Sequence, residues 1–159
     1  MNTNKMLWLV LGILFSALIA VAVYKAWPLL FPKAAVTLML DAECDLRAGP
    51  CSSPLPEGGN ITLSIKPRSI PVIKPLTLEV DVQGLNAESV EVDLTGLDMY
   101  MGFNRVKLKE TGKGRFNGEG RIPVCVRDAM RWEAKVMVKT SRELYIAPYR
   151  FITVKGEAE

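Results

Sequence analysis

The stretch Leu76-Thr-Leu-Glu-Val-Asp-Val-Gln83 decides the fold, because its apolar and polar side chains alternate without a break. Successive side chains of a β-strand point to opposite faces, so this alternation predicts a strand with one buried face and one solvated face. The same period of two recurs in residues 60–66, 90–95, 116–126, 132–138 and 145–154, and residues 35–40 begin the series. No segment after residue 33 shows the helical period of 3.6. Seven or eight such strands predict an all-β domain, an immunoglobulin-like antiparallel β-sandwich.

An uncharged apolar run precedes this domain. Residues 6–23 read MLWLVLGILFSALIAVAV, and at 1.5 Å per residue they span about 27 Å, close to the thickness of a bilayer's hydrocarbon core. A cleaved signal peptide is the alternative, but its apolar region is shorter, and Lys25-Ala-Trp-Pro28 is a poor cleavage context. The sequence therefore predicts an uncleaved signal anchor, a transmembrane helix with a short stalk, over residues 1–33. The sandwich domain occupies residues 34–159.

The net charge of +3 belongs to the anchor rather than to the domain. Lys5, Lys25 and Lys33 are three of the 20 basic residues, so the domain has 17 basic against 17 acidic residues. Phosphate binding needs a basic excess, and a neutral domain argues against nucleic acid as a partner. Within the domain, residues 34–103 are mainly acidic and residues 104–150 mainly basic. Cross-strand salt bridges are the favoured explanation of this asymmetry, and a surface that steers a charged partner is the alternative.

The chain contains no histidine. Ser-His-Asp and Cys-His nucleophiles are therefore excluded, as are His-ligated zinc and blue-copper sites. Any metal must be held by sulfur or carboxylate ligands. We expect a protein that is not an enzyme.

Cys44 and Cys51 are separated by six residues that include a Gly-Pro turn. This spacing favours a small disulfide-closed loop, although a third cysteine, Cys125, leaves other pairings open. Disulfides persist in oxidising compartments. We therefore expect a single-pass protein of the inner (cytoplasmic) membrane with its domain on the periplasmic side.

Residues 104–109 set the orientation of a basic strand. Arg105, Lys107 and Lys109 alternate with Val106 and Leu108, so the three cations are expected to point outward and form a stripe. This stripe is the surface that the sequence offers to a charged partner.

Three sulfur-bearing residues are candidate metal ligands. Met99 and Met101 share the outward parity of the basic strand, unless a bulge at Gly102 reverses it and buries them. Cys125 also falls on a charged, outward face, because Phe116, Ile122 and Val124 take the inward positions of its strand. Thioether and thiolate ligands select Cu(I), and Met130 or Met137 are further sulfur donors that could join the set.

Glycines interrupt the inward face of the same strand. Gly118 and Gly120 leave space there for a bulky neighbour such as Trp132, or mark a bulge.

The anchor, the small sandwich, the Met99-Tyr-Met-Gly102 step and the late strands with glycines and aromatics together resemble FixH/YtkA-like membrane-anchored extracytoplasmic proteins. This resemblance implies a non-enzymatic accessory role in Cu(I) handling or in the assembly of haem–copper respiratory oxidases. It implies a respiratory membrane complex or a copper-handling protein as partner, and Met99 and Met101 as ligands. The chain lacks the histidine often found beside these methionines, which argues against Cu(II). The alternative is a structural or adaptor domain that binds a partner membrane protein without a metal.

Overall fold

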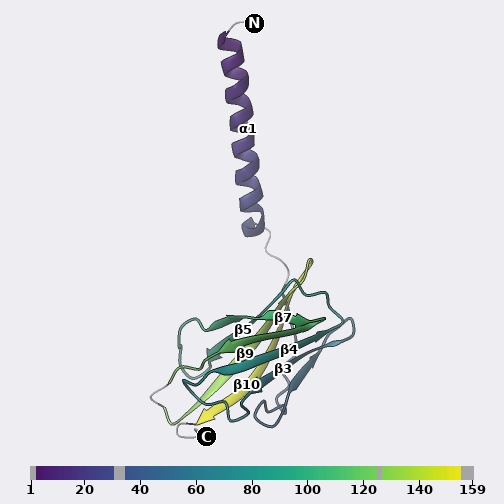
Figure 1. The fold of residues 1–159 in the computed structure, drawn as a ribbon, viewed down its shortest axis with the longest axis vertical. Helices are drawn as coiled ribbons and strands as arrows, with labels where there is room; N and C mark the ends of the chain where they lie inside the picture. Colours follow the sequence, from purple (N-terminus) through teal and green to yellow (C-terminus); the bar gives the residue numbers. More distant parts are fainter. Residues whose placement is uncertain (1–2, 31–34, 125–126, 155–159) are drawn as a thin grey trace. The chain divides into compact units, whose positions relative to one another are not determined.

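The computed structural model describes residues 3–30, 35–124 and 127–154, and the chain divides into two compact units, residues 1–34 and 35–159. The first unit contains the helix α1 (Thr3–Leu30), and the second contains ten β-strands (Figure 1). The expected β-sandwich preceded by one helix is therefore confirmed.

Helix α1 is apolar on all sides. The apolar span is longer than the 18 uncharged residues read from the sequence, because the 21 residues Met6–Ala26, with one lysine among them, are long and apolar enough to cross a membrane. A helix without a polar face has no surface suited to water. The helix fits a membrane anchor or a signal sequence.

The domain consists of two five-stranded sheets. Sheet A has the order β1 (Ala35–Thr37), β10 (Leu144–Val154), β9 (Ala129–Lys139), β5 (Ser89–Gly96) and β6 (Arg105–Lys107). Sheet B has the order β2 (Cys51–Pro54), β3 (Asn60–Lys66), β4 (Leu76–Gln83), β8 (Arg115–Gly120) and β7 (Lys109–Gly112). Neighbouring strands are antiparallel except for β1, which pairs in parallel with β10.

The alternation seen in the sequence corresponds to burial in the core between the sheets. The four apolar residues of β4 are buried, and its polar residues are not. On β9, Trp132 and the three inward residues that follow it are fully buried, as predicted. Two large polar tips in this core are satisfied: Trp132 Nε1 donates to Thr153 Oγ1 at 3.0 Å, and the Tyr149 hydroxyl donates to the Ile61 carbonyl. Burial also raises the pKa of the Tyr149 phenol.

Two strand predictions were wrong. The basic strand is divided, because β6 pairs with β5 in sheet A whereas β7 pairs with β8 in sheet B. The space at Gly118 and Gly120 is taken by this crossing segment rather than by Trp132, since a Cβ at Gly118 would meet Leu108 and Val106.

The strand expected over residues 116–126 is also shorter. Strand β8 ends at Gly120, whose partner Leu76 is the first residue of β4, so no partner strand continues the ladder. Ile122 is still buried as predicted, but Val124 is 52% exposed instead of buried.

Candidate functional site

A disulfide joins Cys44 and Cys51, the pairing that the spacing favours, with Cα atoms 5.8 Å apart. Cys51 is the first residue of β2 and is buried in the core. The disulfide therefore ties the loop after β1 to the edge of sheet B.

The methionine step lies in a loop rather than on a strand. Residues 97–104 connect β5 to β6 without regular structure, and Gly102 has a φ of +79°. Met99 is 40% exposed, whereas Met101 is half-buried against the core. Neither the unbroken strand, which would expose both methionines, nor the strand with a bulge, which would bury both, is present.

Met101 and a second methionine, Met130, both lie beside Gly96. A Cβ added at Gly96 would lie 3.3 Å from Met101 Cγ and against Met130 Cε, so the bare glycine gives both side chains room to approach. Cys125 lies outside the described residues. Among the residues that the structure describes, no three His, Cys, Asp or Glu side chains gather as they would around a metal. Among the candidate sulfur ligands, Met101 and Met130 are thus the two whose side chains both lie beside Gly96.

The stripe of Arg105, Lys107 and Lys109 is exposed, as the alternation predicts. It nevertheless spans two sheets, because Arg105 and Lys107 belong to β6 and Lys109 begins β7. The Arg105 guanidinium lies 3.5 Å from the Asp93 carboxylate and 3.9 Å from that of Glu91. The positive charge of Arg105 is therefore partly balanced by these two carboxylates of β5.

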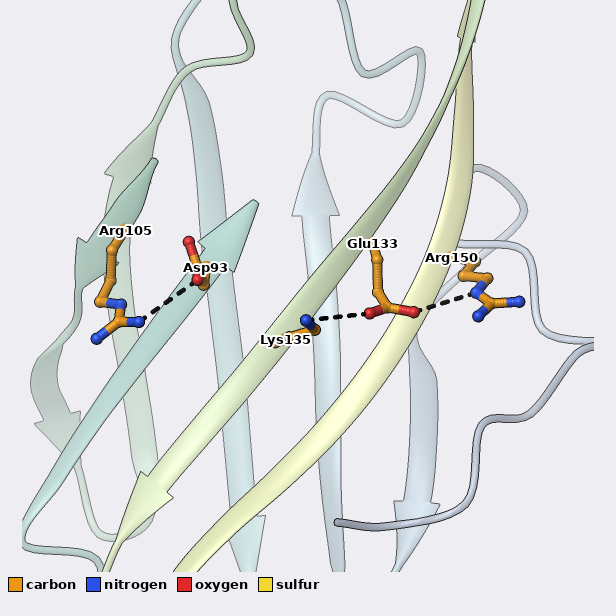
Figure 2. A network of polar contacts seen from close by, with 5 residues as sticks. All are labelled: Asp93, Arg105, Glu133, Lys135 and Arg150. Carbon is orange, nitrogen blue, oxygen red and sulfur yellow. Dashed lines mark hydrogen bonds and ion pairs between the residues drawn. The ribbon is translucent and has the colours of Figure 1, made fainter. Parts of the chain in front are cut away.

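Ion pairs cross the outer face of sheet A. Figure 2 shows Arg105 beside Asp93, and Glu133 between Lys135 and Arg150. The Glu133 carboxylate lies 3.5 Å from Lys135 Nζ and 3.1 Å from Arg150 Nε, and the residue is only 9% exposed. The Arg105–Asp93 pair is a cross-strand salt bridge of the kind expected from the charge asymmetry, whereas Glu133 pairs with cations of its own, basic part of the chain. Both sets of contacts indicate stabilisation of the sheet rather than a binding site.

A further ion pair fixes the start of the methionine loop. Arg131 donates to the Asp98 carboxylate from its backbone N–H at 2.9 Å and from its guanidinium at 3.0 and 2.6 Å. These hydrogen bonds lower the pKa of Asp98 and raise that of Arg131. The loop is therefore held to β9 by a contact between residues 33 positions apart in the sequence.

Exposed apolar side chains gather at one end of the sandwich, which we call the apolar end. It is formed by the loop after β3, the loop after β5, the segment after β8 and the last residues of β10. Its members are Ile73, Leu97, Met99, Tyr100, Phe103, Val124, Ile152 and Val154. In the part of the domain that the structure describes, the remaining large apolar side chain with comparable exposure is Met39. Sequence reasoning missed this surface, because its members come from four separate segments.

A groove of about 420 Å³ opens at the apolar end, between the loop after β3, the loop after β5 and the segment after β8. Its lining is mainly apolar: Ile73, Met101, Phe103, Asn104, Arg121, Ile122 and Pro123. Two hydrogen bonds hold its walls together, because the Asn104 side chain donates to the Arg121 carbonyl at 2.7 Å and the Ile73 N–H donates to the Ile122 carbonyl at 2.8 Å. The groove therefore exists in the domain alone.

The loop that carries Ile73 has an unusual backbone. Ile70 and Ile73 have φ angles of +46° and +67°, in the left-handed region that β-branched residues rarely adopt. Ile70 is buried in the core, whereas Ile73 is 62% exposed. Burial thus offsets the unfavourable backbone at Ile70 much more than at Ile73.

Comparison of the chain with family models, with curated proteins and with solved structures finds no match. The resemblance to FixH/YtkA-like proteins therefore stays a prediction.

Proposed function

We propose that this chain is a non-enzymatic accessory protein that is anchored in the inner membrane by α1 and binds a partner membrane protein through its β-sandwich domain. The domain acts on the periplasmic side, where an oxidising environment maintains the Cys44–Cys51 disulfide. The absence of histidine from the sequence supports a binding role rather than a catalytic one.

The observation that carries this proposal is the exposure of the apolar end. Phe103 is 89% exposed, Tyr100 73% and Ile73 62%. Single exposed apolar residues are ordinary, but contiguous apolar patches usually mark interaction sites. Aromatic residues and methionine are also enriched at protein interfaces.

Crosslinking of the intact chain in its native membrane tests the proposal. We expect one stoichiometric partner, and proteolysis of the domain in spheroplasts but not in intact cells. Recovery of the chain without a partner contradicts the binding role, and protection of the domain in spheroplasts contradicts the periplasmic location.

A second candidate function is Cu(I) handling in the assembly of a respiratory oxidase, and the position of both Met101 and Met130 beside Gly96 favours it. Thioethers suit Cu(I), a soft ion that would be carried as cargo. Met99 belongs to the same loop and is a third candidate donor, with Cys125 as a fourth.

Titration of Cu(I) against a competing chelator tests this second function. The intact chain should compete, and Met101→Leu and Met130→Leu should each weaken the competition. Met39→Leu is the matched control, because Met39 is 88% exposed and far from Gly96 in the fold. If the unmodified chain does not compete, the copper role is removed and the binding role is unaffected.

A further inference from the structure

The apolar end is concave, and this shape limits what it can bind. The groove of about 420 Å³ between Ile73 and Phe103 has the size of a pocket for one or two side chains. A surface that inserts into lipid needs protruding apolar side chains but no groove. The groove therefore fits the side chains of a protein segment better than it fits a bilayer.

The charge at the groove is positive. Arg121 is the charged residue that lines it, and Lys74 is the exposed neighbour of Ile73 in the sequence. The Arg121 guanidinium lies 3.4 Å from the Glu119 carboxylate, but both side chains are about two-thirds exposed, so this contact is weak. Arg121 can therefore exchange Glu119 for a carboxylate of a ligand, and the occupant should carry an acidic residue beside its apolar ones.

The backbone conformation at Ile73 is a second argument that this surface is functional. Left-handed φ values at non-glycine residues are found where a functional site needs them. Ile70 has a structural reason for its conformation, because its side chain is 1% exposed in the core. At Ile73 the N–H donates to the Ile122 carbonyl, which fixes the backbone, but most of the side chain is exposed at the groove. A glycine would suit this backbone better, so the isoleucine side chain is explained by contact with another molecule.

The apolar end is far from the point where the chain enters the domain. Strand β1 begins at Ala35, opposite Leu144, and Val154 ends the same 11-residue strand β10. At 3.3 Å per residue, the two ends of the domain are about 33 Å apart.

We infer that the groove between Ile73 and Phe103 is the docking site for an acidic, apolar segment of the partner protein. This inference rests on the proposed function and names the surface and the chemistry of the segment. Ile73 and Phe103 contact the apolar side chains of the segment, and Arg121 pairs with its carboxylate.

Photocrosslinking in native membranes tests the docking site. The intact chain carries p-benzoylphenylalanine in place of Phe103, Met39 or Lys107, one position at a time. Met39 is the control for an exposed apolar residue away from the groove, and Lys107 is the control for the basic stripe. We expect a protein adduct from position 103, with a crosslinked peptide that contains both bulky apolar and acidic residues.

Second substitutions then test the assigned contacts. With the crosslinker at position 103, Ile73→Gly and Arg121→Ala should each lower the adduct yield about tenfold, which is the usual effect of truncating a central interface residue. Met39→Ser should leave the yield unchanged. Because Ile73→Gly relieves the backbone, its urea midpoint should stay close to that of the native chain, and this measurement separates a lost contact from unfolding.

The possible results separate the two proposals. Adducts at position 103 with lipid alone, with a second copy of the chain, or with a basic segment overturn the docking site. Protein adducts from position 39 or 107 without one from position 103 also overturn it, but they leave the proposed partner binding intact. No protein adduct from any position overturns both.

Discussion

The stability of two variants at Ile73 tests whether its backbone is strained. Ile73→Ala and Ile73→Gly remove the same contacts beyond Cβ, so they differ mainly in backbone preference. An alanine in the left-handed region costs about 1–2 kcal/mol, whereas glycine adopts it freely but loses about 0.5–1 kcal/mol more chain entropy on folding. The glycine variant should therefore be the more stable by roughly 0.5–1 kcal/mol. With a urea slope near 2 kcal/mol/M, the unfolding midpoints should differ by about 0.3–0.5 M.

The assay is urea unfolding of the intact chain in detergent micelles, followed by the fluorescence of the buried Trp132, with Trp8 and Trp27 replaced by phenylalanine. Ile152 provides the matched control, because it is 48% exposed on β10 and does not have a positive φ. At Ile152 the glycine variant should be less stable than the alanine variant by about 0.5–1 kcal/mol. The two sites should therefore give opposite signs. If alanine is the more stable at Ile73 as well, the strain and its functional explanation are both refuted.

Three other predictions concern the contacts around the site and the fold. Asp98→Asn should remove a pH-dependent part of the stability: because the hydrogen bonds from Arg131 lower the pKa of Asp98, its contribution is full above about pH 5 and disappears as the pH falls through the folded-state pKa. The difference in urea midpoint between the native chain and Asp98→Asn should therefore shrink between about pH 5 and pH 2. The double variant Cys44→Ser, Cys51→Ser should lose about 2–3 kcal/mol of unfolding free energy, and reductant should cause the same loss in the native chain. Glu133→Gln removes a nearly buried carboxylate that two cations share and should cost about 1–2 kcal/mol in the same unfolding assay.

The strands could be predicted from the sequence because burial in a sandwich follows a local rule. Each strand has one face on the core, so a period of two in hydrophobicity is enough to place Leu76 and Trp132 inward and Arg105 outward. The charge asymmetry was also informative, since acidic β5 pairs with basic β6 and β9 in sheet A. The first inference needs only the order of neighbouring residues within one strand, and the second needs only the net charge of whole segments.

The methionine loop could not be predicted, because distant contacts determine its conformation. Asp98 is held by Arg131, 33 residues later, and Asn104 by Arg121, 17 residues later. The sequence around Met99 and Met101 continues the alternation of the neighbouring strands and gives no sign that the strand ends. The parity argument considered an unbroken strand and a strand with a bulge at Gly102, and the segment is instead a loop.

The apolar end escaped detection for a different reason. Its residues occupy four segments between Ile73 and Val154, and each is an ordinary apolar residue in its own segment. They come together only because strands β3, β5 and β8 end, and β9 begins, at the same end of the sandwich. Knowledge of strand order and direction was needed to see that these separate residues form one surface.

The departures from alternation are nevertheless informative once they are placed in the fold. Ile73, Phe103 and Val124 are apolar where a domain that only had to fold would favour polar residues, and all three lie at the same end. Unrelated exceptions would be scattered over the loops at both ends, as expected for incidental exposure. Their concentration beside a groove, together with a backbone angle that isoleucine disfavours, indicates one common cause. Contact with another molecule is a cause that accounts for the position, the apolar character and the strain at the same time.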